Sequence, residues 1–388
     1  MMNTKEKLPH DLVIEILSWL HVKHLCPLRF VSKFWYKLLT KDTQFAKLQF
    51  DRYMELNNNH PDPSILGSIC WMEDENDSNL IFATEFESID EALPLEYPFY
   101  KPTNTYIVCG ISYGLLCISR CDGKEVYIWN PLINDHISIS CLPAPSIRFP
   151  GYRNSTGFGF GFDQDSNIYK VVRIFNEIDF DEETSEIHDK KTQISVYSIG
   201  VDSMWRTVEV DIPHYLRSTC RIIPLVNGVL HWRTNRPGTT SWDLIVTFDL
   251  KEEVTSEFLL PHGVKFEGIV ELSGFLCAID RRIYEQETQI WVMKEYGVVS
   301  SWSKQYIIGK PEGYIPVYHL SALSVARNGE IVLTNHYENL VLYNPETNTI
   351  KDLKEFRFAV FLAYAYLGSI ISPTAVSQAG HNLLEEKS

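Results

Sequence analysis

The stretch "GFGFGFDQDSNIYKVVRIF", residues 157–175, decides the fold class of the chain. Its three glycines alternate strictly with three phenylalanines, which in an extended chain places the glycines on one face and the rings on the other. "DQDSN" then supplies turn formers and "IYKVVRIF" a second β-branched and aromatic run, so the stretch predicts a β-hairpin. A phosphate-binding loop is the alternative, but its G-x-G-x-x-G spacing, its following helix and its Lys-Ser/Thr pair are all missing.

The composition supports a large β-rich body. The 388 residues are 45% hydrophobic and 13% aromatic, which favours strands over helices and suggests more than one domain. The start of the chain has no apolar signal-peptide core. The longest apolar run, "FAVFLAYAYLGSII" over residues 358–371, is too short to span a bilayer and is predicted to be a strand.

Strand patterns recur through the body at a regular interval. Five equivalent positions are separated by 68, 50, 45 and 51 residues, namely Ile128, Val196, Val246, Trp291 and Leu342. A period near 50 with four strands per unit is typical of a kelch-like β-propeller. We therefore expect an all-β propeller of about six blades, with five or seven as alternatives, and a pair of β-sandwiches as the other architecture. The strand within 358–371 is expected to close the ring by completing a blade begun by N-terminal strands.

The Gly-Phe alternation then has a structural interpretation. Glycines on one face of an inner strand allow a neighbouring blade to approach closely, while the phenylalanines fill the space between sheets.

The first fifty residues have a different, helical pattern. Leu12, Val13, Ile16, Leu17 and Leu20 recur at helical spacing after Pro9, and further apolar residues follow Pro27, which together predict three short helices. A bundle of this size buries too little apolar surface to be stable alone. Part of its apolar stripe must pack either on the C-terminal body or on a partner protein.

The run "LPHDLVIEILSWL...VSKFWYKLL" closely resembles the F-box, the motif that binds the Skp-type adaptor of cullin ubiquitin ligases. The resemblance implies an adaptor-binding surface, or a core behind it, formed by Leu8, Pro9, Leu12, Ile16, Leu20, Val31 and Trp35. Two positions depart from the motif. His21 stands where a Pro is usual, and Pro27, which lacks an N–H, is expected to break a helix already under way and to delay the second helix.

The body resembles the F-box-associated domain of plants, through "GFGFGFDQDSNIYKVVRIF", "ISVYSIGVDSMWRTVEV", "NGVLHW" and "IWVMKEYGVVSSWSKQYII". The whole chain is similar to the S-locus F-box proteins and their relatives. This resemblance implies a substrate receptor of an SCF-type ligase, whose target in the S-locus case is a non-self, basic pistil ribonuclease. The expected domains are a helical domain (1–50), a linker (51–65), a propeller-like domain (66–376) and a tail (377–388).

Charge is unevenly distributed along the chain. The formal net charge is −15, and because residues 1–50 carry +4, the remainder carries −19. The negative charge of this body repels nucleic acid and would attract a basic partner protein. Alternatively, it serves only to keep the protein soluble. The segment 176–191 is predicted to be an acidic loop, which is either merely solvated or contacts a basic target. Its candidate target-binding residues are Glu177, Asp179, Asp181, Glu182, Glu183 and Glu186.

No catalytic motif is present, so the chain is expected to position a target without reacting itself. His231 lies in an apolar strand and is expected to be structural. The eight cysteines form no C-x-x-C pair and suggest buried thiols in a reducing compartment, the cytoplasm or also the nucleus. Cys117, Cys121 and His136 have irregular spacing for metal ligands, and we expect no cofactor. The alternative function is a protein- or sugar-binding propeller whose F-box no longer assembles a ligase.

Overall fold

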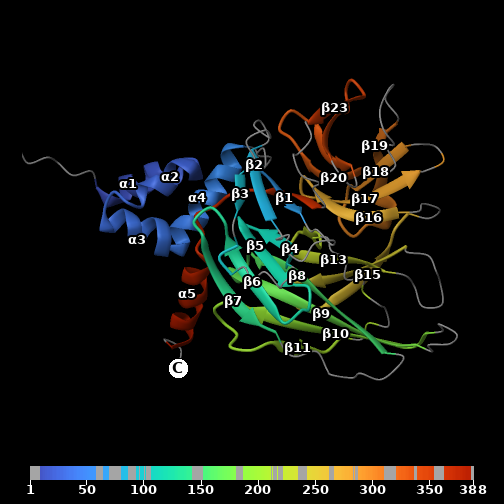
Figure 1. The fold of residues 1–388 in the computed structure, drawn as a ribbon, viewed down its shortest axis with the longest axis horizontal. Helices are drawn as coiled ribbons and strands as arrows, with labels where there is room; N and C mark the ends of the chain where they lie inside the picture. The colour runs from blue at the N-terminus through green and yellow to red at the C-terminus, as the bar shows by residue number, and fades with distance from the viewer. Residues whose placement is uncertain are drawn as a thin grey trace, which may run out of the picture.

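A helical N-terminal region precedes an all-β region in the computed structural model of the chain (Figure 1). This arrangement confirms the predicted order of a small α-helical unit and a β-propeller. The structure describes residues 9–57, 64–69, 80–85, 93–95, 97–99, 101, 106–141, 152–180, 187–210, 212, 216, 222–234, 243–261, 266–282, 284, 287–309, 320–335, 339–353 and 362–385.

The N-terminal region, residues 9–57, forms four helices and is called the helical bundle below. Its helices are α1 (His10–Ser18), α2 (Val22–Leu28), α3 (Lys33–Lys41) and α4 (Thr43–Leu56). Ser32 Oγ accepts a hydrogen bond from Trp35 N at 3.2 Å, and Asp42 Oδ1 accepts one from Phe45 N at 2.9 Å. These two caps start α3 and α4. The prediction of three helices was therefore wrong by one, because α4 runs through the start of the predicted linker.

The two departures from the F-box motif do not delay the second helix, contrary to expectation. His21 caps α2, since its Nδ1 accepts a hydrogen bond from Lys23 N at 3.3 Å. Pro27 lies in the last turn, where its missing N–H removes one hydrogen bond at most and the helix ends one residue later. Helix α2 therefore starts at Val22, directly after its cap.

Six four-stranded antiparallel sheets make up the described part of the body. Five of them use consecutive strands. The first is β4 (Tyr106–Ser112), β5 (Leu115–Arg120), β6 (Glu125–Asn130) and β7 (Asp135–Ser140). The second is β8 (Tyr152–Asp163), β9 (Ile168–Phe180), β10 (Ile187–Ser198) and β11 (Arg206–Val208). The third is β12 (Leu225–Val226), β13 (Val229–Thr234), β14 (Leu244–Asp249) and β15 (Thr255–Leu259).

The remaining consecutive sheets follow the same pattern. The fourth is β16 (Phe266–Leu272), β17 (Phe275–Arg282), β18 (Glu287–Met293) and β19 (Trp302–Ile308), the last preceded by the 3₁₀ turn η2 (Val299–Ser301). The fifth is β20 (Leu320–Val325), β21 (Ile331–Asn335), β22 (Asn339–Asn344) and β23 (Thr349–Leu353).

The sixth sheet joins the two ends of the body. Strand β24 (Leu362–Tyr366) pairs antiparallel with β1 (Ser64–Ile69), which is followed outward by β2 (Leu80–Glu85) and β3 (Leu93–Leu95). The expected ring closure by the strand within 358–371 is therefore confirmed. The prediction of about six blades is corrected to five blades of consecutive strands in the described part of the chain, which was one of the alternatives, and this composite sheet joins the two ends of the body.

The five positions chosen as equivalent in the sequence occupy equivalent places in the fold. Each lies on the third strand of its sheet: Ile128 on β6, Val196 on β10, Val246 on β14, Trp291 on β18 and Leu342 on β22. The first interval of 68 residues is long because β8, β9 and β10 have 12, 13 and 12 residues. An extended hairpin, and not only an added loop, accounts for this interval.

The glycines of β8 face the neighbouring sheet, as the sequence predicted. A Cβ at Gly159 would lie 2.7 Å from Leu230 Cδ1, and one at Gly161 would lie 2.6 Å from Leu250 Cδ1. The alternating phenylalanines of β8 are at most 5% exposed and pack into the core on the other side. The alternation thus serves blade packing, and no helix follows it that could hold a phosphate.

Gly110 of β4 provides the sharpest packing test. Its Cβ would lie 2.7 Å from Phe160 Cβ, 3.2 Å from Phe160 N and 3.3 Å from Phe160 Cα, so relief requires movement of backbone. We expect Gly110→Ala to lower the free energy of unfolding by roughly 1–3 kcal/mol. Gly159→Ala is expected to cost less, because it meets the flexible end of Leu230. Urea titrations of the two variants check this order, which equal costs would contradict.

The C-terminal segment, residues 367–379, lies between the helical bundle and the propeller and is called the C-terminal clasp below. Helix α5 (Pro373–Glu385) begins inside it and packs on β7 and α4 (Figure 1). Asp135 caps this helix, accepting hydrogen bonds from Thr374 N at 3.2 Å and from Thr374 Oγ1 at 2.7 Å. Because α5 extends to Glu385, most of the expected C-terminal tail over 377–388 is helical.

One hydrophobic cluster unites the helical bundle, the clasp and the first two consecutive sheets. It contains Leu17, Val22 and Leu25 of the bundle together with Ile370 and Ile371 of the clasp. The bundle therefore packs on its own body through one side, as one of the two sequence hypotheses proposed.

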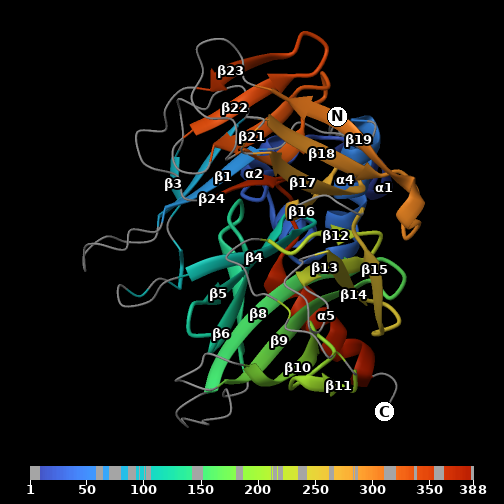
Figure 2. The same ribbon diagram turned by 90° about the vertical axis from the view of Figure 1, so that its right-hand side faces the viewer.

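The strand order gives the propeller two distinct faces. The β4–β5 turn meets the bundle, since the rings of Phe50 and Tyr113 are 4.8 Å apart, and this side is called the bundle face below. Because antiparallel strands alternate in direction, the β5–β6 connection at residues 121–124 lies on the opposite side, called the far face. Figure 2 views the molecule from the side away from the bundle.

Candidate functional site

Helix α1 leaves an apolar stripe exposed on the helical bundle. Leu12 is 51% exposed, Ile16 54% and Trp19 42%, and their spacing of four and three residues puts them on one side of the helix. Opposite this side, Leu17 and Ser18 are buried against the rest of the bundle.

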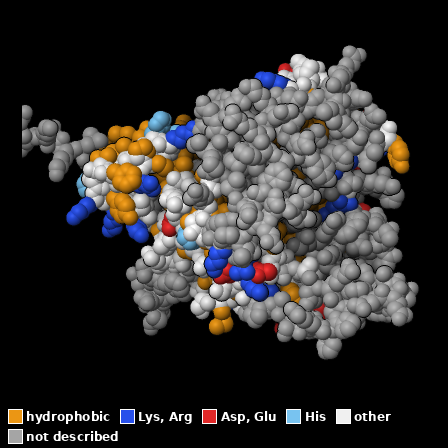
Figure 3. All heavy atoms as spheres, in the orientation of Figure 1, with side chains coloured by type: hydrophobic (Ala, Val, Ile, Leu, Met, Phe, Trp, Pro, Cys, Tyr) orange, Lys and Arg blue, Asp and Glu red, His pale blue; other side chains and the backbone are white. Residues whose placement is uncertain are grey.

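The α2–α3 connection and α3 continue this exposed surface. Phe30 is 77% exposed, Val31 63% and Tyr36 50%. Figure 3 shows hydrophobic side chains gathered over the helical bundle. The docking stripe is defined here as Leu12, Ile16, Trp19, Phe30, Val31 and Tyr36. Clustered large apolar side chains on a soluble surface mark a site of protein association.

Helix α4 fixes the position of α1 behind the stripe. Arg52 Nη2 donates to Glu15 Oε2 at 2.9 Å, and the guanidinium lies 4.6 Å from the ring centroid of Trp19. The Trp19 indole N–H donates to Glu15 Oε1 at 3.1 Å. Hydrogen bonds from Arg52 and then from Trp19 lower the pKa of the Glu15 carboxyl, which stays ionised at neutral pH.

The structure places the seven predicted adaptor-binding residues in two groups. Pro9, Leu12, Ile16 and Val31 are exposed, whereas Leu20 and Trp35 are partly buried against the core and Leu8 lies outside the described residues. Sequence reasoning missed three exposed members of the docking stripe, namely Trp19, Phe30 and Tyr36. The helical spacing from Ile16 could have found Trp19.

The acidic segment 176–191 has a different structure from the expected loop. Strand β9 extends through Glu177 to Phe180 and β10 begins at Ile187, so only residues 181–186 connect them. Asp179 lies on β9, and the predicted residues Asp181, Glu182, Glu183 and Glu186 lie outside the described residues. The C-terminal end of β9 and the N-terminal end of β10 lie toward the far face (Figure 1).

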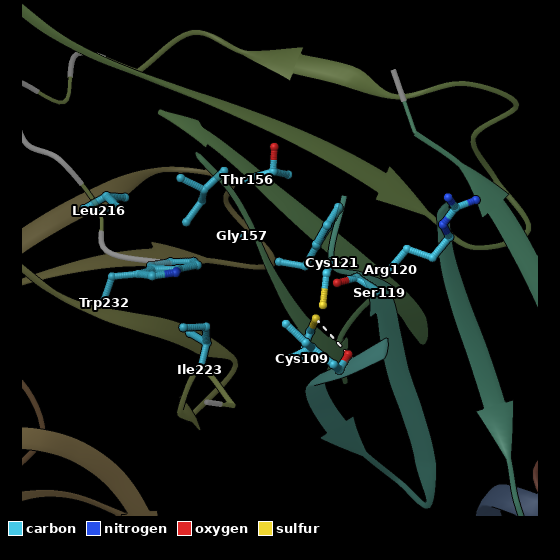
Figure 4. Close-up of a pocket in the computed structure, with 12 residues that line it drawn as sticks. Cys109, Ser119, Arg120, Cys121, Thr156, Gly157, Leu216, Ile223 and Trp232 are labelled. Atoms are coloured by element: carbon cyan, nitrogen blue, oxygen red, sulfur yellow. Dashed lines mark hydrogen bonds between the residues drawn. The ribbon is translucent and has the colours of Figure 1, made fainter. Parts of the chain in front are cut away.

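A small pocket opens between the first three consecutive sheets on the far-face half of the body (Figure 4). Trp232, Ile223 and Leu216 form one side, Cys109 and Ser119 the other, and Gly157 lies between them. The pocket has a volume of about 40 Å³, which holds only a few water molecules and is too small for a cofactor.

His231 of β13 is fully buried, as expected of a structural histidine. Its Nε2 lies 2.9 Å from the Tyr296 hydroxyl and its Nδ1 lies 3.3 Å from the Pro224 carbonyl oxygen. Removal from water lowers the pKa of the imidazole from 6.5 to about 4. The side chain is therefore neutral at physiological pH.

This low pKa predicts acid sensitivity. As the pH falls from 6.5 toward 4, the unfolded chain binds a proton at His231 that the native protein does not bind. Stability is therefore lost over this window, by about 1.4 kcal/mol per pH unit from this residue. Urea titrations at pH 7, 5 and 4 should show a shallower pH dependence for His231→Gln than for the wild type. Parallel pH dependences would contradict the assignment.

The described cysteines are in no disulfide, in keeping with the predicted thiols. Cys109, Cys117 and Cys277 are buried, and Cys121 alone among the described cysteines is exposed. Burial raises the pKa of the Cys277 thiol to about 12, which makes it a poor nucleophile. Among the described residues, no group of three or more His, Cys, Asp and Glu side chains is placed to hold a metal ion.

The chain thus combines a helical bundle, which bears an exposed apolar stripe, with a β-propeller body. Residues 6–46 match the F-box domain, and residues 70–360 match the F-box associated beta propeller domain. Because the second match covers most of the chain, the protein belongs to the F-box-associated β-propeller family.

Several Arabidopsis thaliana proteins resemble the whole chain. F-box protein At3g07870 is 26% identical over 90% of this chain and 87% of its own length. F-box protein CPR1 is 26% identical over 89% of this chain and 84% of its own. F-box/kelch-repeat protein At3g23880 is 24% identical over 96% of this chain and 97% of its own length. In the part of the chain that the structure describes, no helix has the length and apolarity to span a membrane.

Proposed function

We propose that this protein is the substrate receptor of an SCF-type cullin ubiquitin ligase. The observation that carries the proposal is the docking stripe, a set of large apolar side chains left exposed on a bundle whose other side is buried against the propeller. Stable association would bury these side chains on a Skp-type adaptor and link the chain to the cullin through it.

In this proposal the two faces of the propeller serve different partners. The bundle face holds the docking module, and the far face is free to meet a target. In this role the protein contributes proximity, because holding target and ligase together raises their effective concentration without any catalytic residue of its own. Ubiquitin transfer and the resulting degradation signal would come from the other subunits. We place this activity in the cytoplasm, with the nucleus as a second location.

A finer proposal concerns the target. The body outside residues 1–50 carries −19, and residues 176–191 on the long hairpin include seven acidic residues against two lysines. These charges would steer a basic protein toward the far face. Non-self ribonucleases of self-incompatibility, which the S-locus resemblance implies, are one basic target class that fits.

Co-elution tests the ligase proposal. The full chain, a Skp-type adaptor and the N-terminal region of a cullin should elute from gel filtration as one complex with equal stoichiometry. Omitting the adaptor should separate the chain from the cullin. Elution of the chain apart from an adaptor–cullin complex at micromolar concentration would contradict the proposal, and the chain would then be a binding propeller without a ligase.

A further inference from the structure

Ser32 stands inside the docking stripe with its side chain exposed. It ends the short connection between α2 and α3, directly after the exposed side chains of Phe30 and Val31. Tyr36, the third neighbouring member of the stripe, donates its backbone N–H to the Ser32 carbonyl oxygen at 2.9 Å. A partner that covers the stripe at this connection would therefore also cover the Ser32 hydroxyl.

The same serine begins helix α3. Its Oγ accepts a hydrogen bond from Trp35 N at 3.2 Å, and the first turn of α3 contains no acidic residue. The helix starts instead with the exposed Lys33. Because a helix N-terminus and a neighbouring lysine both favour negative charge, an anionic group on the Ser32 oxygen would not disturb the free chain.

Arg29 lies three residues before Ser32. Its guanidinium carbon is 4.8 Å from the ring centroid of Phe30, and its Nε makes no hydrogen bond within the described part of the chain. An arginine at this distance before an exposed serine is a charge pattern by which kinases with an acidic substrate groove select their targets. The connection thus carries both a phosphate acceptor and a basic residue for its recognition.

We propose that Ser32 is a phosphorylation site at which a kinase selective for basic substrates switches off adaptor docking. In the transfer step, Ser32 Oγ attacks the γ-phosphorus of ATP and the bond from that phosphorus to the β-phosphate oxygen breaks. ADP leaves, and the hydroxyl proton passes to a carboxylate of the kinase. The product carries a charge of about −1.5 to −2 at neutral pH.

The switch follows from the two environments of this phosphate. In the free chain it is hydrated and lies beside Lys33 at the start of α3. In the complex it would lose water against an apolar partner surface, next to Phe30 and Val31, at a large cost in free energy. This inference rests on the proposed function, and it adds that docking is controlled by covalent modification of the docking stripe itself.

Calorimetric titration of an adaptor into charge-matched variants tests the switch. Ser32→Asn and Ser32→Asp both supply an N-cap side chain and differ by one charge. The Asn variant should bind a Skp-type adaptor like the wild type, the Asp variant about tenfold or more weakly, and the full chain with phosphoserine at position 32 about a hundredfold or more weakly. Wild-type affinity of the phosphoserine chain would overturn the proposal.

Two controls separate docking from damage. Phosphoserine at the exposed Ser300 of the propeller, outside the docking stripe, should leave adaptor affinity unchanged. The urea midpoint of the chain phosphorylated at Ser32 should be no lower than that of the wild type. A lower midpoint would overturn the switch, because the lost affinity would then follow from damage to α3.

A kinase assay tests the acceptor without relying on docking. With ATP and a kinase that requires arginine three residues before serine, mass spectrometry should find phosphate on Ser32 of the full chain. Arg29→Gln should slow this reaction by about tenfold or more, and saturating adaptor should prevent it. No phosphate on Ser32 in the adaptor-free chain would overturn the site, whereas failure of the unmodified chain to bind the adaptor would count against the ligase function instead.

Discussion

Replacing Leu12 and Ile16 together by glutamate should abolish capture of a Skp-type adaptor while leaving the propeller folded. Both side chains are about half exposed, so the substitutions remove little from the bundle core. In the complex, however, each would lose roughly 1.5–3 kcal/mol of apolar burial, and each would place a carboxylate against an apolar partner. The affinity should therefore fall by roughly a hundredfold to ten-thousandfold.

A matched control separates this loss from general damage. Val254→Glu makes one substitution of the same kind, adding a single carboxylate at a residue of the propeller that is 53% exposed and lies outside the docking stripe. Calorimetric titration with the adaptor should give wild-type affinity for this control and no measurable binding for the double variant. If the double variant, with an unchanged urea midpoint, still bound the adaptor like the wild type, the docking stripe would be the wrong surface.

Asn130→Ala should cause the largest loss of stability from a single residue. The Asn130 side chain is fully buried, and its Nδ2 donates to the carbonyl oxygens of Ser369 at 2.9 Å and Ile371 at 2.8 Å. Its Oδ1 accepts from Leu132 N at 3.0 Å. The alanine removes the partner of two buried carbonyl oxygens and of the partly buried Leu132 N–H, at about 1–3 kcal/mol for each buried group, so we expect a loss of roughly 3 kcal/mol or more.

Because these bonds hold the C-terminal clasp, the damage should begin there. Hydrogen exchange should accelerate first in residues 369–376 and then across the contact between the helical bundle and the propeller. Asn134→Gly, in the same turn, serves as the control, since Asn134 is exposed and its φ of 54° suits glycine. A change below 1 kcal/mol for Asn130→Ala would show that the clasp does not depend on this residue.

The propeller could be predicted from the sequence because its signals are local and repeated. The Gly-Phe alternation fixes which side of β8 meets each neighbour, and the five equivalent positions fall on third strands. Ring closure followed from one apolar run that was too short to cross a membrane. In each case a strand periodicity of two residues was visible without knowledge of distant contacts.

Two helices were missed because their signals are weaker or tertiary. Helix α4 buries Phe45, Ala46, Gln49 and Phe50 at helical spacing, but the polar end of the segment resembles a linker. Helix α5 has a local start signal that was overlooked, since Ser372 Oγ accepts a hydrogen bond from Ala375 N at 3.0 Å and Pro373 is its first residue. Its second cap contact, from Asp135 more than 230 residues earlier in the chain, depends on tertiary structure and leaves no pattern near the helix.

The candidate sites could be predicted only in part from the sequence, because they too depend on tertiary packing. Spacing places Leu12 and Ile16 on one side of α1, but it does not show which side the propeller covers. That choice depends on the packing of Leu17, Val22 and Leu25 into a core shared with the clasp. The pocket beside Gly157 likewise depends on how closely three sheets approach, which the strand pattern alone does not determine.

Hydrogen exchange of the full chain with and without a Skp-type adaptor tests the central claim most directly. We expect added protection confined to α1, to the connection from Arg29 to Ser32 and to α3, with no change in residues 119–124 on the far face. Such a result would establish that the adaptor binds the helical bundle and leaves this part of the far face uncovered. Protection of residues 119–124 by the adaptor, or none on α1, would contradict it.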